Sequence, residues 1–325
     1  MLSKRMLTLM VLLIGSLALV CAGCNLSTEQ QEAWEGSMHA DSTAEAFVHW
    51  DEDDPAEIST RCARCHSTQG FIDFVGADGT DPGAVDNAVP AATGEINISC
   101  DVCHDESGAH RSITSVTFPS GVTIDNLGLG AICMQCHQGR KSGISVQEDI
   151  DAAGVGDDEI SEDLGFVNIH YYAAGATLYG SEAKGGYEYA GETYTGYNAH
   201  AQDLNSCVAC HNPHSLAVDT ERCSPCHPSG FDSAKTDISE LQEQLMAAIQ
   251  SYASSVAGSG IVYDATSHPY FFDEAGEEYS AWTPRLLKAT YNYQTSKKDP
   301  GAFAHNKKYI VELLQTSLDD INSVL

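Results

Sequence analysis

The stretch 207-CVACHNPH-214 decides how the rest of this chain is interpreted. It contains a Cys-x-x-Cys pair, a histidine directly after the second cysteine, and a further histidine three residues later. The Cys-x-x-Cys-His pattern occurs four more times, as CARCH (62–66), CDVCH (100–104), CMQCH (133–137) and CSPCH (223–227). These five motifs contain all of the chain's cysteines except the two at positions 21 and 24.

Each of these motifs is the attachment signal of a c-type haem. Two thiols bond covalently to the haem, and the histidine that follows them becomes the proximal iron ligand. Zinc ribbons and redox-active pairs also use Cys-x-x-Cys, but neither needs a histidine after every second cysteine. The sequence therefore predicts five haem c groups. The attachment cysteines are Cys62, Cys65, Cys100, Cys103, Cys133, Cys136, Cys207, Cys210, Cys223 and Cys226, and the proximal ligands are His66, His104, His137, His211 and His227.

A histidine is expected as the second axial ligand of most of these haems. Only Met38, Met134 and Met246 lie beyond the first 23 residues, too few for five methionine ligands. His214 lies three residues after His211, too close to pass around the same haem, so it is expected to ligate a different one. The distal candidates are His39, His49, His110, His170, His200 and His214. Which of them serves which haem stays open, as does whether one haem keeps an open position.

Two histidines, His268 and His305, are less favoured as ligands because they lie in a part of the chain that has no cysteine.

The N-terminus has the pattern of an export signal over residues 1–23. Lys4 and Arg5 precede an apolar run at 6–20, which is too short to be read as a membrane span. The sequence VCAGC (20–24) resembles a bacterial lipobox, which implies cleavage before Cys24 and acylation of its sulfur. Ordinary signal cleavage nearby is the alternative. A lipid anchor places the protein in the cell envelope, and Asn25 favours the outer membrane, on either its periplasmic or its outer face.

The formal net charge of −30 limits the partners that the chain can bind. Nucleic acids and anionic lipid surfaces are excluded by such a strongly acidic surface. The charge suits a soluble body that is held at a membrane through its lipid anchor.

The chain resembles the multihaem c-type cytochromes of dissimilatory metal-reducing bacteria, of the doubled-CxxCH type. The segments that carry the resemblance are CVACHNPH (207–214), WEGSMHA (34–40), CMQCHQGR (133–140), NIHYYAAGATLYG (168–180) and AFAHNKKYIVELL (302–314). The resemblance implies electron transfer through stacked haems with two histidine ligands each, and it implies His214 and His39 as distal ligands. His110 is less directly implied, because CHDESGAH (103–110) departs from the doubled form.

Four segments follow from these motifs: the signal peptide (1–23), an acidic N-terminal tether (24–60), a pentahaem domain (61–230) and a C-terminal helical region (231–325). The expected fold class is a mainly irregular and α-helical multihaem cytochrome c, with little β-structure and a haem array as its core. Short hairpins are predicted at 113–124 and 187–194.

The sequence of the C-terminal region predicts three helices that pack on the haem array. The first has apolar residues at helical spacing over 238–256, with Asp237 and Glu240 as its N-terminal cap. Thr283-Pro284 begins the second helix. The third runs through Tyr309 to Ile321.

The function predicted from these features is electron transfer across or outside the cell envelope, in anaerobic or extracellular respiration, without substrate turnover by the chain itself. Other multihaem cytochromes and an extracellular metal or other terminal acceptor are the expected partners. Two alternatives stay open. One is a pentahaem reductase of nitrite, hydroxylamine or a sulfur oxyanion, and the other is a subunit of a polymerised cytochrome filament.

Overall fold

The computed structural model describes residues 28–91, 96–201 and 204–325. The predicted signal peptide and Cys24 lie outside them. The described residues form two compact units, one within Met1–Ile113 and Val208–Asp219 and the other within Thr114–Cys207 and Thr220–Leu325. Helices and irregular segments dominate both, and the sheets of the described residues are three antiparallel pairs of two-residue strands. The expected fold class, mainly helical and irregular with short hairpins, is confirmed.

The first unit contains short helices and one strand pair. These are α2 (Thr28–Glu35), α3 (Glu45–Val48), α4 (Thr60–His66), α5 (Thr68–Phe74) and α6 (Cys100–Cys103), with β1 (Glu57–Ile58) paired to β2 (Val89–Pro90). Helices α4 and α5 pack closely because Gly70 has no side chain: a Cβ there would lie 2.4 Å from the Ala63 carbonyl carbon. Ser67 caps α5, and its hydroxyl accepts a hydrogen bond from the Gly70 N–H at 2.9 Å.

The second unit begins with small elements. They are β3 (Val116–Thr117), β4 (Thr123–Ile124), α7 (Gly130–Met134), α8 (Gly143–Ala153), α9 (Ala174–Tyr179), η1 (Gly180–Glu182), α10 (Cys207–Cys210, which crosses into the first unit), η2 (Thr220–Arg222), β5 (Val262–Tyr263) and β6 (Phe271–Phe272). Strands β3 and β4 pair with Val116 opposite Ile124, so the hairpin predicted at 113–124 is confirmed.

The hairpin predicted at 187–194 is wrong. The chain turns at Ala190–Gly191 but forms no strand ladder. Side chains take up the backbone groups that a ladder would use: the Tyr187 N–H donates to Asn292 Oδ1 at 2.7 Å, and the Tyr189 N–H donates to the Tyr194 hydroxyl at 2.9 Å. Tertiary contacts to these tyrosines therefore replace the cross-strand bonds that their alternation predicted.

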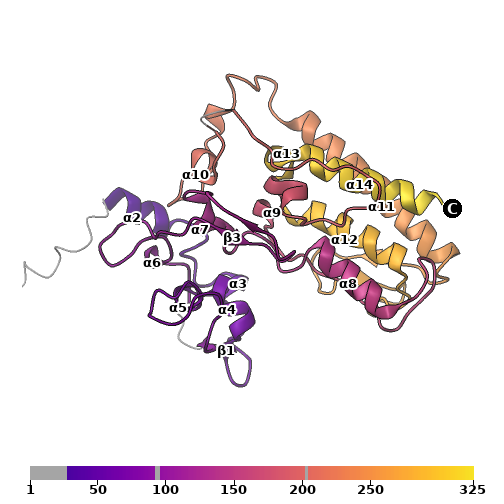
Figure 1. Ribbon diagram of the computed structural model, residues 1–325, viewed down its shortest axis with the longest axis horizontal. Coiled ribbons are helices and arrows are strands. Elements are labelled where there is room, and N and C mark those ends of the chain that lie inside the picture. Colours follow the sequence, from indigo (N-terminus) through magenta and orange to yellow (C-terminus); the bar gives the residue numbers. More distant parts are fainter. Residues whose placement is uncertain (1–27, 92–95, 202–203) are drawn as a thin grey trace, which may run out of the picture. The chain divides into compact units, whose positions relative to one another are not determined.

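The C-terminal part consists of α11 (Asp232–Ser255), α12 (Pro284–Lys298), α13 (Ala302–His305) and α14 (Lys307–Asn322). Helices α11, α12 and α14 pack against one another and are coloured orange to yellow in Figure 1. The three predicted helices are confirmed. Thr283 caps α12, with its hydroxyl accepting from the Leu286 N–H at 3.2 Å, as Thr283-Pro284 predicted.

The predicted start of the first of these helices is wrong, because α11 begins five residues before Asp237. Aromatic packing between Phe231 and Phe303, whose ring centres lie 5.3 Å apart, and the Lys235 ammonium over the Phe303 ring hold the added turn against α13. Asp237 lies inside the helix and pairs with Lys307 instead of capping it.

Helix α12 is buried over 14 of its 15 residues, polar ones included. Asn292 shows how such burial is sustained, because its amide donates to the Tyr187 carbonyl at 2.8 Å and to Ser317 Oγ at 3.0 Å.

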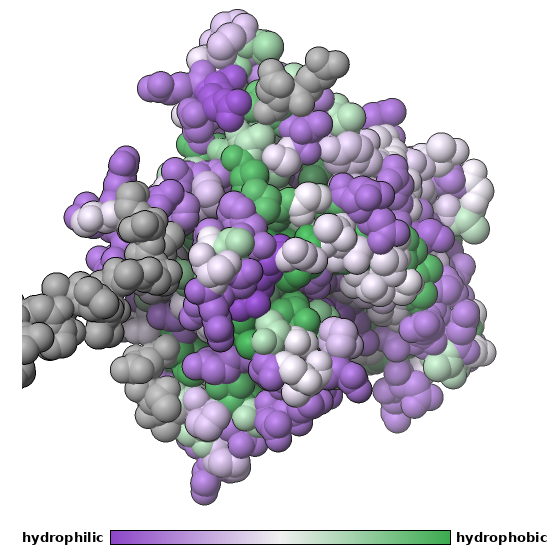
Figure 2. Space-filling view, turned by 60° about the vertical axis from the view of Figure 1, so that its left-hand side comes forward, coloured by the Kyte–Doolittle hydropathy of each residue, from purple (hydrophilic) through white to green (hydrophobic). Residues whose placement is uncertain are grey.

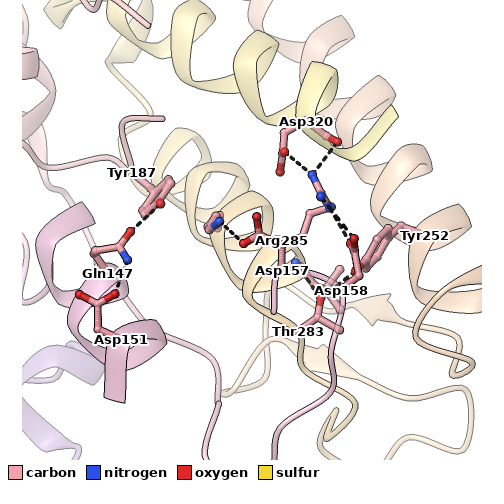
Figure 3. A network of polar contacts seen from close by, with 11 residues as sticks. Gln147, Asp151, Asp157, Asp158, Tyr187, Tyr252, Thr283, Arg285 and Asp320 are labelled. Atoms are coloured by element: carbon pink, nitrogen blue, oxygen red, sulfur yellow. Dashed lines mark hydrogen bonds and ion pairs between the residues drawn. The ribbon is translucent and has the colours of Figure 1, made fainter. Parts of the chain in front are cut away.

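A polar network joins the loop after α8 to this helical bundle (Figure 3). Arg285 binds Asp158 at 2.7 Å and also contacts Asp320 of α14, while Lys288 binds Asp157 at 2.6 Å. The Tyr252 hydroxyl of α11 donates to Asp158 at 2.8 Å. One buried guanidinium thus joins the loop, α12 and α14.

The chain is strongly acidic, with a formal net charge of −30. On the face in Figure 2, hydrophilic residues predominate and hydrophobic residues show between them. None of the helices in the described residues combines the length and the apolar character needed to cross a membrane.

Candidate haem-attachment and axial-ligand sites

Helical turns position the cysteines of the motifs. The first motif lies on α4, the second on α6, the third at the end of α7 and the fourth on α10. Residues three and four apart share one face of a helix, so both thiols and the following histidine emerge on the same side. Backbone hydrogen bonds from the histidine N–H to the carbonyl of the first cysteine close this turn at His104, His137 and His227, with distances of 2.9, 3.0 and 2.9 Å.

The thiols of the motifs have the chemistry that haem attachment needs. None of the ten motif cysteines forms a disulfide bond within the described residues. A hydrogen bond with Cys133, aided by the charge of His305, lowers the pKa of Cys207 to about 7. Burial, with the neighbouring Cys100 thiol, instead raises the pKa of Cys103. The thiolate is the nucleophile in sulfur chemistry, so the fourth motif contains a thiol that is already partly activated.

Four of the five motif histidines are oriented by a backbone carbonyl. Their Nδ1–H groups donate to a carbonyl oxygen: His66 to Ala46 at 2.8 Å, His104 to Gly108 at 3.0 Å, His137 to Tyr172 at 3.3 Å and His211 to Leu216 at 3.4 Å. A proton on Nδ1 leaves the lone pair on Nε2, which is the atom that binds a metal. The side chains therefore fit the role of proximal ligands.

The structure brings a second histidine close to two of the motif histidines. The His104 and His214 rings lie 6.4 Å apart at an angle of 4°, and the His227 and His200 rings lie 6.1 Å apart at 28°. Two imidazoles that bind one metal ion from opposite sides have ring centres about 6 Å apart, because each metal–nitrogen bond is about 2 Å long. Both pairs match this spacing.

The sequence HNPH supplies the local reason for the position of His214. The side-chain oxygen of Asn212 accepts hydrogen bonds from the N–H groups of His214 and Ser215, both at 2.9 Å. Asparagine before proline favours this kind of turn. Burial, together with His104 and His110, lowers the pKa of His214, which favours the neutral imidazole that metals bind.

His110 lies beside His104, with ring centres 4.8 Å apart and planes tilted by 30°. This distance is shorter than the spacing across a metal ion. A backbone bridge pairs the two residues, which explains why they are adjacent. The structure therefore places His110 next to the second motif. It is His214, however, whose ring distance from His104 matches the spacing of two ligands across a metal ion.

The remaining distal candidates are His39, His49 and His170. His49 binds Glu45 at 3.0 Å and its side chain is 62% exposed, with Trp50 lying between it and His66. The backbone carbonyl of His39 accepts from the Ile98 N–H at 2.9 Å, just before the second motif. His170 has a φ of +74° and lies two residues before the carbonyl that orients His137.

The structure gives His305, a less favoured ligand on sequence grounds, a buried carboxylate as its partner. Its Nδ1 lies 2.9 and 2.8 Å from the two carboxylate oxygens of Asp299, and Asp299 is only 3% exposed. The sequence DPGAFAH (299–305) contains the signal, since Asp-Pro-Gly makes a turn that returns the carboxylate to the histidine. His305 was less favoured as a ligand because it is distant from every cysteine in the sequence.

Five sets of two thiols and a following histidine, carried by short helices and irregular segments, are what a polyhaem c-type cytochrome needs, and the chain is homologous to such proteins. It is 26% identical over 358 residues to the C-type polyheme cytochrome OmcB of Geobacter sulfurreducens, covering 86% of this chain and 46% of that protein. The same organism's C-type polyheme cytochrome OmcC is also 26% identical, over 86% of this chain and 45% of its own length. The chain therefore spans about half the length of the curated relatives it matches.

Among solved structures, the chain is similar to the outer cell wall cytochrome OcwA, with a TM-score of 0.48 and 18% identity over 90% of this chain and 50% of that one. No family model matches the sequence.

Proposed function

We propose that this chain is an electron-transfer protein that holds five haem c groups, most of them with two histidine ligands. The observation that carries the proposal is the spacing of two histidine pairs, His104 with His214 and His227 with His200. When bound, each haem supplies an iron that takes up and releases one electron. Two nitrogen ligands occupy both axial positions, which suits electron transfer and leaves no position for a substrate.

The chain's own residues hold this chemistry in place. Paired cysteines fix each cofactor covalently, and the carbonyl groups that bind the Nδ1 atoms of the motif histidines keep those rings from turning. The net charge of −30 favours the ferric form over the ferrous form, so low reduction potentials are expected.

One segment contributes to several of the proposed sites. His200 lies opposite His227 of the fifth motif, Cys207 hydrogen-bonds with Cys133 of the third, and His214 lies opposite His104 of the second. Since Cys133 and Cys207 both belong to the second unit, their contact supports the proposal that the haems of the third and fourth motifs are close neighbours.

The setting proposed for this activity is the cell envelope. Cys24 would hold the lipid anchor, and residues 61–230 and 231–325 would form the pentahaem domain and its helical partner. Residues 24–60, expected as an acidic tether, are folded over 28–60, where α2, α3 and β1 belong to the first unit and Phe47 and Ile58 are buried. Other multihaem cytochromes, and an extracellular metal or other terminal acceptor, are the proposed redox partners. The cysteine pattern and the homology to polyhaem cytochromes support this setting.

The test is the mass, the spectrum and the potential of the protein purified from membranes. Five covalently bound haems, an acylated Cys24, low-spin ferric signals and midpoint potentials below the hydrogen couple are expected. A lower haem count, or potentials centred above that couple, would contradict the proposal. A high-spin ferric signal would instead favour the reductase alternative, because it reports an open iron position.

A further inference from the structure

Two attachment cysteines from different motifs meet in the second unit. Cys133 and Cys207 are 74 residues apart in the sequence, yet the Cys207 thiol lies against α7, the helix that carries Cys133, and the two thiols interact. Gly130 makes room for this approach, since a Cβ at that position would lie 3.3 Å from Cys207 Sγ. The third and fourth motifs therefore begin side by side, and the contact between Cys133 and Cys207 is named here the thiol junction.

Helix α13 brings His305 to the thiol junction. Two successive residues connect them: the Asn198 amide donates to the His305 carbonyl at 2.8 Å, and the Tyr197 hydroxyl donates to the Asn205 carbonyl at 3.0 Å, two residues before Cys207. Gly301 lies against the imidazole, where a Cβ would be 2.5 Å from Cε1, so the ring is closely confined.

Asp299 determines which nitrogen of His305 can bind a metal. Both of its carboxylate oxygens lie within 2.9 Å of Nδ1, so the imidazole proton belongs on Nδ1 and the lone pair belongs on Nε2. A buried carboxylate that binds the far nitrogen of a histidine is the usual support of a metal ligand, and it makes that ligand more basic. The side chain of Asp299 is held in turn by the Gly301 N–H, which donates to it at 3.0 Å.

The other histidines of the second unit outside the motifs are placed differently. His200 lies opposite His227. His170 belongs to the segment whose Tyr172 carbonyl binds Nδ1 of His137, which is the side of that ring away from its ligating nitrogen. His268 is exposed. His305 is thus the histidine that combines proximity to an attachment cysteine with a buried orienting carboxylate.

We propose that His305 is an axial iron ligand of one of the two haems joined at the thiol junction, and that Asp299 is its positioning residue. This inference rests on the proposed haem content of the chain. It adds a seventh distal histidine to the six predicted from the sequence, and it gives the haem-binding region a ligand from the cysteine-free C-terminal part.

The experiment compares purified, haem-loaded variants in the full chain. In His305→Ala, one of the haems is expected to change from low-spin to high-spin in the ferric EPR spectrum, with the covalent haem count unchanged by mass. His305→Met is expected to keep that haem low-spin, raise its potential and add the long-wavelength absorption band of a methionine–iron bond. His268→Ala, at an exposed histidine, is the matched control and should leave the spectrum unchanged.

Asp299→Asn tests whether Asp299 positions His305. It also tests the proposal if the His305→Ala variant does not fold. It should keep all haems low-spin while raising the potential of one of them, because an amide accepts the Nδ1 proton less strongly than a carboxylate. Asp299→Glu should restore most of the original potential. A purely structural role would alter stability without moving one potential selectively.

Two further parent chains, each lacking one pair of attachment cysteines, identify which haem His305 serves. If the ligand serves the third motif, His305→Ala should add no spectral change to a chain that carries Cys133→Ala and Cys136→Ala; if it serves the fourth, the same holds for Cys207→Ala with Cys210→Ala. Unchanged low-spin signals and potentials in His305→Ala, His305→Met and Asp299→Asn would overturn the inference. Absence of haem from the unmodified protein would instead overturn the proposed function.

Discussion

The imidazole rings of His104 and His214 lie 6.4 Å apart and within 4° of parallel, although 110 residues separate them in the sequence. His104 follows the second attachment motif and His214 follows the fourth. The spacing matches two ligands on opposite sides of one metal ion. This spacing supports the proposal that His214 serves the haem of the second motif and not the one attached three residues before it.

His214→Ala is expected to convert one low-spin haem to a high-spin form, because the second haem loses its distal ligand. EPR of the ferric protein measures the change. The same substitution should have no further effect in a chain that carries Cys100→Ala and Cys103→Ala. An effect that disappears instead with Cys207→Ala and Cys210→Ala would show that the fourth haem is the one affected.

His200→Ala is expected to act in the same way on the haem of the fifth motif. The physical reason is its position opposite His227, with ring centres 6.1 Å apart. The high-spin signal should be absent when Cys223→Ala and Cys226→Ala are already present. His268→Ala serves as the control, and equal spectra for the two single variants would refute the pairing.

Asn212→Ala is expected to weaken the binding of His214 without abolishing it. The substitution removes two hydrogen bonds that fix the turn, at a cost of about 1 kcal/mol. We expect a mixture of low-spin and high-spin forms at the second haem, with the high-spin fraction rising on warming in variable-temperature optical spectra. Asn212→Asp keeps the acceptor oxygen and should behave like the unmodified protein.

Arg285→Met is expected to lower the free energy of unfolding at pH 7 by about 2 kcal/mol, because it leaves two carboxylates without their cation. The Arg285 side chain is 9% exposed and that of Asp158 is 42% exposed, so solvent screens part of the interaction. Lys308→Met is the matched control, since Lys308 is 77% exposed and 3.8 Å from Glu312.

The effect of Arg285→Met should depend on pH in a defined direction. A hydrogen bond from Arg285 lowers the pKa of Asp158 below 3.8, so the unfolded chain binds this proton more readily. The stabilisation is present above the unfolded pKa and is lost as pH falls through the folded one. Urea unfolding should therefore show a large difference between variant and parent at pH 7 and a smaller one at about pH 3. A difference that does not shrink would refute this origin.

The local sequence was sufficient where the chemistry depends on neighbouring residues. Cys-x-x-Cys-His identifies the attachment sites because one helical turn places two thiols and a histidine on one side. Thr283-Pro284 predicted the start of α12 for the same reason, since a helix cap is satisfied within four residues. The alternation of aromatic residues at 187–194 predicted a hairpin that does not form, because distant side chains such as Asn292 supply the hydrogen bonds there.

By itself, the sequence predicted the class of cofactor, the proximal histidines and a role for His214 at another haem, because a three-residue link cannot reach around a porphyrin. Only the tertiary structure decided that His214 lies opposite His104, that His200 lies opposite His227, and that Asp299 orients His305. An axial ligand needs only to arrive on the correct side of the iron, so its position in the chain is unconstrained. Chain folding alone selects which of the spare histidines arrives there.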